Sequence, residues 1–336
     1  MASFSNNKPV WILSHESQTE LALKVVEECR TRMADVGTEI PRQLEFKDVL
    51  QWKKFNDGFP DLFIRDVKEM AGKDVIFIAS FHTVDVIFEQ ISMLYQIPRY
   101  LVHSFTVILP YFPTGTMERI DLEGQVATAK TLATLLSDIP PTARGPTQIM
   151  IFDIHALQER FYFSSKVIPR LETAIQLAEK AIREAYAADI AIAFPDDGAH
   201  KRFHRLFPDE WPRIVCSKTR DGNKRVIRIK EGDPAGKNVV IIDDLVQSGG
   251  TLLEAGKAFR TANASTVSAY VTHPVFPQES WRQFVRDGKG KETPFDNFWI
   301  TDSLPHADAI GRHPPFKVLS LSSVIATTLL GFDLQY

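Results

Sequence analysis

Two kinds of hydrophobic pattern alternate along the whole chain. Short, nearly continuous apolar runs predict buried strands, and longer segments with apolar residues every three or four positions predict amphipathic helices. In the first half, strands are predicted at 10–14, 75–81, 105–109 and 149–152, and helices at 19–33, 84–95 and 125–136. Strands and helices that alternate in this way are typical of a mostly parallel sheet covered by helices, so the predicted fold class is α/β.

The second half repeats this plan. Strands are predicted at 190–194, 213–217, 226–229, 239–242, 267–272 and 298–301, and helices at 171–185, 252–262, 279–285 and from Ser322 onward. Asp221-Gly222 is a strong turn signal and predicts a β-ribbon around it, whereas the proline-broken segment 140–146 predicts a loop. We expect two domains, 1–165 and 166–317, with the C-terminal helical segment 318–336 joined to the first.

Composition narrows the class of protein further. The 336 residues are 44% hydrophobic and 24% charged, which is ordinary for a globular protein and excludes disordered and fibrous classes. The 39 Lys and Arg against 42 Asp and Glu leave a net charge of -3, so no nucleic-acid partner is expected. No apolar run approaches the roughly 18 to 20 residues that span a bilayer, so no membrane partner is expected either.

The N-terminal residues and the cysteines favour a cytoplasmic protein. The chain begins with a short polar stretch that leads directly into an apolar strand, without a signal-peptide core or an Arg-rich transit helix. The two cysteines, Cys29 and Cys216, have no second Cys or His at metal-site spacing. We expect them to be structural residues in a reducing compartment.

The clearest chemical pattern lies in residues 239–251. A predicted buried strand ends in Asp243 and Asp244, and the turn after it, formed by Gln247, Ser248, Gly249, Gly250 and Thr251, opens a helix. Free N–H groups at a helix start and flexible glycines suit a phosphate, and paired carboxylates suit sugar hydroxyls. A turn with a capping hydroxyl would explain Ser-Gly-Gly-Thr alone, but the two acids before it predict a phosphosugar site.

This loop resembles the binding loop that type I phosphoribosyltransferases share with ribose-phosphate pyrophosphokinases. A second motif, Asp153-Ile-His155-Ala-Leu-Gln158 followed by Phe161-Tyr-Phe163, comes after a predicted strand. By itself, Asp-x-His is equally well explained by a structural histidine. The whole motif closely resembles the pyrophosphokinases, however, and phosphoribosyltransferases lack it. Further matches at 110–112, 194–202, 272–276 and 299–305 extend the resemblance over nearly the whole chain.

The resemblance implies a fold, a reaction and a set of site residues. It implies two phosphoribosyltransferase-like α/β domains that transfer the β,γ-diphosphoryl group of ATP to the C1 hydroxyl of ribose 5-phosphate, giving phosphoribosyl pyrophosphate and AMP. The implied cofactor is Mg²⁺, with Asp153 and His155 on the nucleotide side and Asp196 on the ribose side. Lys218 and Arg220 resemble the basic pair of the family's mobile catalytic loop. From the residues alone, Asp196 is equally a helix N-cap, and a solvated basic hairpin is the favoured interpretation of Lys218 and Arg220.

The nucleotide side departs from the most common family pattern. Phe55 and Asp57 match the family, but Phe59 replaces a Glu. The positions that carry Arg-Gln-Asp-Arg-Lys elsewhere are Thr116, Met117, Glu118, Arg119 and Ile120 here, and Gln247 replaces an Asp in the phosphosugar loop. These departures resemble the plant-type, class II branch, which implies several nucleoside triphosphate donors and no activation by phosphate. The family also implies a homo-oligomer that shares nucleotide contacts across an interface.

Two other functions stay open at this point. A phosphoribosyltransferase would use the same loop, but Asp153-x-His155 argues against it. A non-catalytic regulatory homologue would explain the altered residues Thr116, Met117, Phe59 and Gln247. The retained residues His155, Asp196, Lys218 and Arg220, together with the intact 243–251 loop, favour the enzyme.

Overall fold

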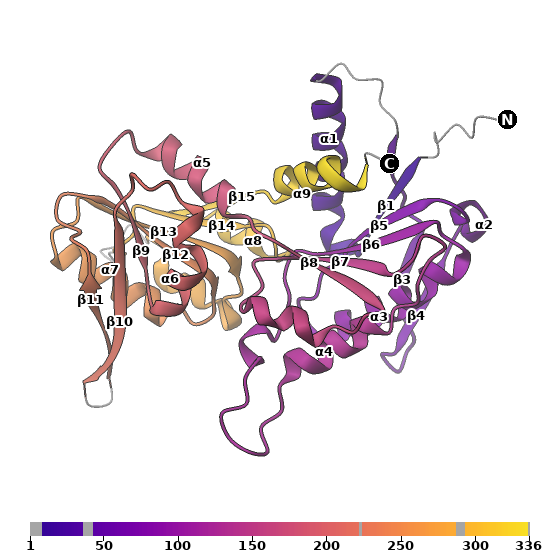
Figure 1. Cartoon of the computed structure of the whole chain (residues 1–336), viewed down its shortest axis with the longest axis horizontal. Helices are drawn as coiled ribbons and strands as arrows, with labels where there is room; N and C mark the ends of the chain where they lie inside the picture. The colour runs from indigo at the N-terminus through magenta and orange to yellow at the C-terminus, as the bar shows by residue number, and fades with distance from the viewer. Residues whose placement is uncertain (1–8, 36–42, 222–223, 287–292, 335–336) are drawn as a thin grey trace. The chain divides into compact units, whose positions relative to one another are not determined.

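The chain folds into two units, each built around its own sheet. The computed structural model describes residues 9–35, 43–221, 224–286 and 293–334. The first unit consists of Met1–Thr173 together with Leu321–Tyr336, and the second of Ala174–Ser320 (Figure 1). In this division the first boundary along the chain falls after Thr173, and Leu321–Tyr336 is grouped with the first unit.

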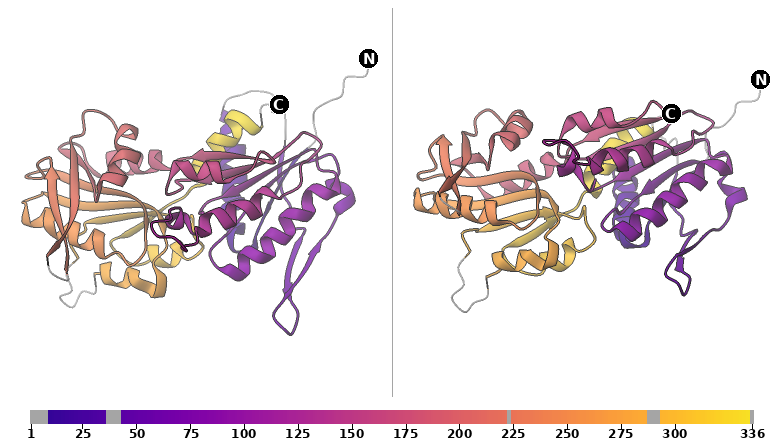
Figure 2. Two further views of the ribbon diagram at one scale, coloured as in Figure 1. Left: turned by 60° about the horizontal axis from the view of Figure 1, so that its bottom comes forward. Right: turned by 90° about the horizontal axis from the view of Figure 1, so that it is seen from below.

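The sheet of the first unit is parallel throughout. Its six strands follow the order β2-β1-β5-β6-β7-β8. They are β1 (Val10–Ser14), β2 (Leu44–Phe46), β5 (Asp74–Ile78), β6 (Ser104–Leu109), β7 (Thr147–Phe152) and β8 (Val167–Glu172). A separate antiparallel hairpin, β3 (Leu50–Lys54) and β4 (Pro60–Ile64), projects away from this sheet (Figure 2).

Helices complete the core of the first unit. α3 (Val84–Gln96) and α4 (Thr128–Ser137) pack their apolar faces on one side of the sheet, where Phe77, Val107 and Ile151 are fully buried. α1 (Thr19–Asp35) and α9 (Ser322–Thr328) pack against each other (Figure 1). The remaining short elements are α2 (Val67–Met70) and the 3₁₀ helices η1 (Glu16–Gln18), η2 (Ile97–Tyr100), η3 (Gly115–Met117) and η4 (Leu157–Tyr162), with a π-helical turn η7 (Leu329–Asp333).

The sheet of the second unit has seven strands in the order β11-β10-β9-β12-β13-β14-β15. Only the pairing of β10 with β11 is antiparallel, and these two strands extend from the sheet as a ribbon (Figure 1). The strands are β9 (Ile190–Phe194), β10 (Arg213–Asp221), β11 (Lys224–Glu231), β12 (Asn238–Val246), β13 (Thr266–Pro274), β14 (Asn297–Thr301) and β15 (Phe316–Leu319). The predicted turn residues 222–223 lie outside the described residues.

Alternating side chains of the central strands bury both faces of this sheet. Ile192 and Val240 point to a cluster that includes residues of α5 (Ile175–Ala185) and α6 (Asp197–Phe203). Ala193 and Ile241 point to the opposite cluster, which includes α7 (Gly250–Thr261) and the 3₁₀ segment η6 (Pro277–Phe284). The short elements η5 (His204–Leu206) and α8 (Ala307–Gly311) complete the unit.

Several sequence predictions need correction. Residues 171–172, predicted to begin a helix, instead end strand β8, whose strand pattern in the sequence is interrupted by Pro169. Proline is tolerated there because β8 is an edge strand, where a missing N–H need not break the ladder. The predicted helix 279–285 is the 3₁₀ segment η6, in which Gln278 and Glu279 have positive φ. None of the described helices is long and apolar enough to cross a membrane.

Candidate functional site

The residues predicted to bind a phosphosugar lie in the second unit, at the point where the order of its strands reverses. The chain passes from β9 to β10 on one side, whereas β12 leads to β13 on the other. Open α/β sheets bind ligands in the crevice outside the carboxyl ends of two such strands. Asp196 follows β9, and Asp243 and Asp244 lie near the end of β12, so the sequence places its carboxylates at this point.

Asp243 lies beside Asp244, and the negative charges of neighbouring carboxylates act on it. The N–H of Asp244 donates to Asp243 Oδ1 at 3.1 Å, and the N–H of Leu245 donates to Asp244 Oδ1 at 2.8 Å. Burial raises the pKa of the Asp243 carboxyl well above its usual range, and the negative charges of Asp244 and Asp196 raise it further. A cation or several hydroxyl donors would relieve this repulsion.

The loop after β12 has the backbone of an anion site. Gly249 adopts a φ of 79°, and a Cβ atom there would lie 2.5 Å from the ring of Phe284, so only glycine fits. Gly250 begins α7, and nothing lies within 4 Å of the place where its Cβ would be. In the described structure the N–H groups of residues 248–252 have no backbone acceptor. Gln247 and Ser248 are exposed, and Thr251 is half-buried.

Asp196 caps a helix. Its Oδ1 accepts the N–H of Ala199 at 3.0 Å, so the N-cap interpretation is confirmed. The same carboxylate repels that of Asp243, which shows that the ends of β9 and β12 lie close together. The proposed metal role of Asp196 stays a prediction.

In the first unit, Asp153 and His155 follow β7 but face different neighbours. Asp153 is buried with a φ of 38°, and its Oδ1 accepts the hydroxyl of Thr173 at 2.7 Å. His155 Nε2 lies 3.9 Å from Glu118 Oε1. The structure therefore joins the predicted metal residue His155 to the predicted nucleotide residue Glu118, whereas Asp153 is engaged by Thr173.

The remaining nucleotide candidates are largely exposed. Thr116 and Met117 lie in η3 at the surface, and the Arg119 side chain pairs with Glu118 at 3.0 Å. Phe55 and Asp57 lie at the tip of the β3–β4 hairpin, where Asp57 Oδ1 accepts the N–H of Phe59 at 3.1 Å. These five residues and Glu118 all belong to the first unit.

Lys218 and Arg220 lie on β10, opposite Ile227 and Arg225 of β11. Their predicted position on a β-ribbon is confirmed, but their side chains lie outside the part of the chain that the structure describes. Their catalytic role stays a prediction.

The side chains that could bind a divalent metal are few in the part of the chain that the structure describes. Within the described residues, no three His, Cys, Asp or Glu side chains gather closely enough to hold a metal ion by themselves. Mg²⁺ commonly keeps several waters and is held by one or two carboxylates plus substrate phosphates. Asp196 with the repelling Asp243 suits such an ion on the ribose side, and His155 with Glu118 offers a weaker set on the nucleotide side.

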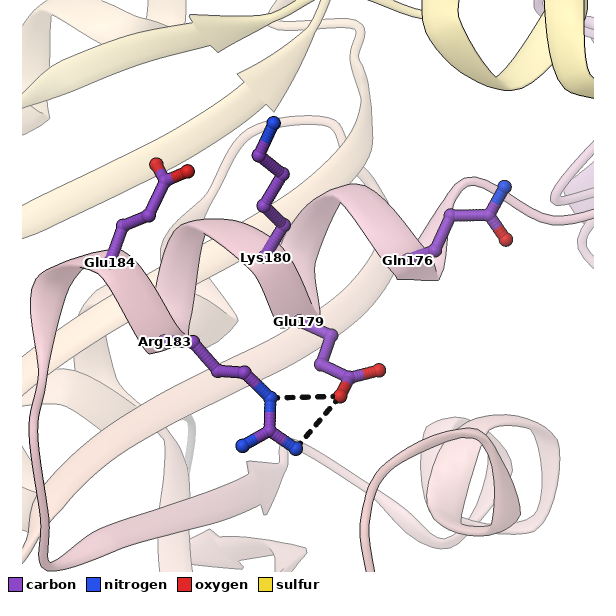
Figure 3. A pocket seen from close by; sticks show the side chains of 5 residues that line it. All are labelled: Gln176, Glu179, Lys180, Arg183 and Glu184. Carbon is purple, nitrogen blue, oxygen red and sulfur yellow. Dashed lines mark hydrogen bonds and ion pairs between the residues drawn. The ribbon is translucent and has the colours of Figure 1, made fainter. Parts of the chain in front are cut away.

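A pocket on α5 lies away from all these residues in the sequence and contains none of them. Its volume is about 420 Å³, and it is lined by Gln176, Glu179, Lys180, Arg183 and Glu184. Figure 3 shows that all five side chains come from one helix and that Arg183 is paired with Glu179. These features are typical of a solvated helix face, and we assign it no ligand.

Two polar residues that contact the 247–251 loop could not be identified from the sequence. Ser280 Oγ donates to the carbonyl of Gln247 at 3.0 Å, and Gln283 Nε2 donates to the carbonyl of Ser248. They lie 33 and 35 positions from the residues whose carbonyls they bind, so no local signal connects the two.

Comparisons with known proteins agree over nearly the whole chain. Residues 10–139 match the family model for the N-terminal domain of ribose phosphate pyrophosphokinase, and residues 163–319 match the phosphoribosyl transferase domain. Ribose-phosphate pyrophosphokinase 4 of Arabidopsis thaliana is 53% identical over 282 residues, which cover 83% of each chain. Ribose-phosphate pyrophosphokinase 3, mitochondrial, of Spinacia oleracea is 51% identical over 83% of this chain and 70% of its own.

A solved structure gives the same fold. The crystal structure of phosphoribosylpyrophosphate synthetase from Mycobacterium smegmatis superposes with a TM-score of 0.77 at 21% sequence identity, covering 97% of this chain and 99% of that one. This match confirms the predicted α/β architecture with two phosphoribosyltransferase-like domains. The plant relatives confirm the resemblance to plant members of the family.

Proposed function

Because the chain belongs to the ribose-phosphate pyrophosphokinase family, we propose that it joins ribose 5-phosphate to the β,γ-diphosphoryl group of a nucleoside triphosphate. The oxygen of the C1 hydroxyl forms a bond to the β-phosphorus, the bond from that phosphorus to the α-phosphate oxygen breaks, and the hydroxyl proton is released. The products are phosphoribosyl pyrophosphate and, from ATP, AMP. The chain is thus an enzyme, a diphosphotransferase.

One observation supports the ribose assignment most strongly. Asp196, Asp243 and Asp244 lie together at the ends of β9 and β12, next to the 247–251 loop. The N–H groups of the 247–251 loop and the hydroxyls of Ser248 and Thr251 bind the 5-phosphate. Asp243 and Asp244 accept hydrogen bonds from the ribose hydroxyls, which orients C1 for attack. No covalent intermediate is required.

The charge that develops during transfer needs cationic partners. Lys218 and Arg220 meet the negative charge on the moving diphosphoryl group, a contact that strengthens in the transition state. Mg²⁺, when bound, neutralises phosphoryl oxygens, and we assign Asp196 to the ion on the ribose side and His155, with Asp153 beside it, to the ion on the nucleotide side. Phe55, Asp57 and the 116–119 segment hold the nucleotide.

The direct test is an assay of the purified protein with Mg²⁺, ribose 5-phosphate and ATP, in which phosphoribosyl pyrophosphate and AMP are quantified together. We expect both products in equal amounts. A phosphoribosyltransferase would consume phosphoribosyl pyrophosphate in the presence of a base and would release no AMP. A regulatory homologue would yield no product with any triphosphate.

We also propose that the chain forms a homo-oligomer in the cytoplasm. Large apolar side chains are exposed around a pocket of about 390 Å³ that lies between the β3–β4 hairpin and α3, among them Phe59 and Phe88. Burial of this surface against a second copy would remove it from water. Light scattering after size exclusion tests the oligomer. Fractionation of cells tests the location, since one relative is named mitochondrial.

A further inference from the structure

The start of the phosphosugar loop is attached by its carbonyl groups to the chain segment that follows β13. The carbonyl of Val246, the last residue of β12, accepts the N–H of Val275 at 3.1 Å and the N–H of Phe276 at 3.2 Å. Both donors belong to the lead-in to η6. The end of β12 is therefore fixed to this segment before the loop begins.

The next two carbonyls are held by side chains of η6. Ser280 Oγ donates to the carbonyl of Gln247 at 3.0 Å. Gln283 Nε2 donates to the carbonyl of Ser248, and its second hydrogen bond, to the carbonyl of Ser280 at 2.8 Å, fixes the amide in place. Three successive carbonyls, those of residues 246, 247 and 248, are thus directed to one side.

This arrangement determines where the loop N–H groups point. In a trans peptide unit the C=O and the N–H point in opposite directions. Within the described residues, the single cis peptide bond is Pro314-Pro315, so the three units of the loop are trans. The N–H groups of Gln247, Ser248 and Gly249 are consequently directed away from η6. Successive N–H groups with a common direction form a concave site for an anion.

Phe284 packs closely against the loop backbone at Gly249. Its ring is fully buried, and it occupies the space that a Cβ at Gly249 would need. The lack of a side chain at Gly249 therefore lets the loop backbone approach η6 closely enough for Gln283 to reach the carbonyl of Ser248.

We propose that Ser280 and Gln283 are positioning residues, which aim the loop N–H groups at the 5-phosphate by binding the carbonyls on the other side of the same peptide units. The proposal rests on the proposed function, because it assigns the phosphate of ribose 5-phosphate to these N–H groups. The two side chains do not touch the substrate. They act before it binds, by fixing the peptide planes of the loop.

The test compares Gln283→Met with Gln278→Met in the full-length protein. Both variants replace a glutamine of η6 by a side chain of the same length without amide groups, but Gln278 is exposed and has no hydrogen bond to the loop within the described structure. Gln283→Met should raise the KM for ribose 5-phosphate about tenfold, as the loss of one hydrogen bond that orients the binding groups predicts. The KM for ATP and kcat should change by less than about twofold, because the phosphate is held equally in ground and transition states.

Variants of Ser280 test the proposal independently of Gln283. Ser280→Ala should raise the same KM, and Ser280→Thr, which keeps the hydroxyl, should restore it. An unchanged KM for ribose 5-phosphate in both Gln283→Met and Ser280→Ala would overturn the proposal. So would an equal loss of ribose 5-phosphate affinity, ATP affinity and kcat, since that pattern indicates general damage.

The failure of the proposed function would look different. In that case the wild-type protein would form no phosphoribosyl pyrophosphate. Calorimetric titration with ribose 5-phosphate would still test the positioning role, because Gln283→Met should bind it about tenfold more weakly than Gln278→Met. Equal affinities of the two variants would refute the positioning role whatever the activity.

Discussion

Lowering the pH from 7 to 5 is expected to destabilise the first unit by about 2 kcal/mol through a single side chain, His15. In this unit the strand order reverses between β1 and β5, and the proposed phosphosugar site of the second unit lies at the equivalent reversal between β9 and β12. His15 is 3% exposed, its Nε2 lies 3.1 Å from Glu89 Oε1, and its ring meets the edge of Trp52.

The hydrogen bonds fix the neutral form of this imidazole. The N–H of Ser17 donates to His15 Nδ1 at 3.2 Å, so Nδ1 accepts and Nε2 carries the proton toward Glu89. A second proton on Nδ1 would end its hydrogen bond from the N–H of Ser17 and leave Ser17 Oγ, which lies 2.8 Å from Nδ1, as the remaining partner. Burial lowers the pKa of His15 from 6.5 to about 4, and its neighbours act less strongly: Glu16 raises the pKa and His82 lowers it.

The direction of the pH effect follows from whether the folded or the unfolded chain binds more protons. The unfolded chain takes up a proton on His15 near its ordinary pKa of 6.5, whereas the folded chain resists it down to about 4. Between these values the unfolded chain binds more protons, so the stability is fully present above pH 6.5 and declines as the pH falls toward 4. At pH 5 the loss relative to pH 7 is about 2 kcal/mol, since each pKa unit is equivalent to about 1.4 kcal/mol.

Urea unfolding at the two pH values measures this effect. Other groups titrate as well, and burial raises the pKa of Glu89, which contributes with the opposite sign. The comparison is therefore made with His15→Asn, whose amide oxygen still accepts the N–H of Ser17. The acid-induced loss of unfolding free energy should be about 2 kcal/mol larger in wild type than in this variant. His313→Asn, an exposed control, should behave as wild type. Equal losses in wild type and His15→Asn would refute the reasoning.

Three further predictions concern the second unit and the thiols. Lys218→Ala and Arg220→Ala should each lower kcat by about 10²-fold or more with little change in ribose 5-phosphate binding, and near-normal kcat in both would remove the ribbon from the site. Cys29 and Cys216 should resist maleimide in the native protein but react fully in urea, because burial raises the pKa of each thiol to about 12; rapid native labelling would contradict this. Asp243→Asn should raise the KM for ribose 5-phosphate more than it lowers kcat, which steady-state kinetics with a varied sugar concentration would show or disprove.

The central strands and the glycine turn after β12 were predictable because their signals are local. The run that ends in Asp243 and Asp244 is buried on both faces of a parallel sheet, which leaves a continuous apolar stretch in the sequence. The glycine that the loop needs at position 249 is visible for the same reason, since its positive φ is a requirement of the local backbone. Such features depend on neighbours within a few positions.

Other features depend on contacts between distant segments. Ser280 and Gln283 look like ordinary polar residues until the fold places them under the loop carbonyls. The family resemblance implies that Asp153 is a metal residue beside His155, but no local signal reveals that Thr173 engages its carboxylate. Strand β8 was missed because the penalty for Pro169 depends on whether the strand lies at an edge, which only the topology decides.

On the nucleotide side, how strongly the protein distinguishes between bases also depends on contacts that only the fold reveals. A site discriminates strongly between bases when the wrong base leaves buried polar groups unpaired. Here Thr116 and Met117 are exposed in η3, and Phe59 is 64% exposed at the hairpin. The nearby polar groups are already engaged, since Asp57 accepts the N–H of Phe59 and Glu118 pairs with Arg119.

We therefore expect GTP, CTP and UTP to serve as donors with kcat/KM within about two orders of magnitude of ATP, the range that a weakly polar pocket permits. The measurement is kcat/KM for each donor at saturating ribose 5-phosphate. Thr116→Arg combined with Met117→Gln should widen the preference for one base, because these side chains add groups that a wrong base leaves unpaired, whereas alanine at both positions should leave it unchanged. Discrimination against every other base beyond about 10⁴-fold in the wild type would mean that backbone groups or a second subunit read adenine. In that case the exposed side chains at 116 and 117 would not be the ones that determine the donor.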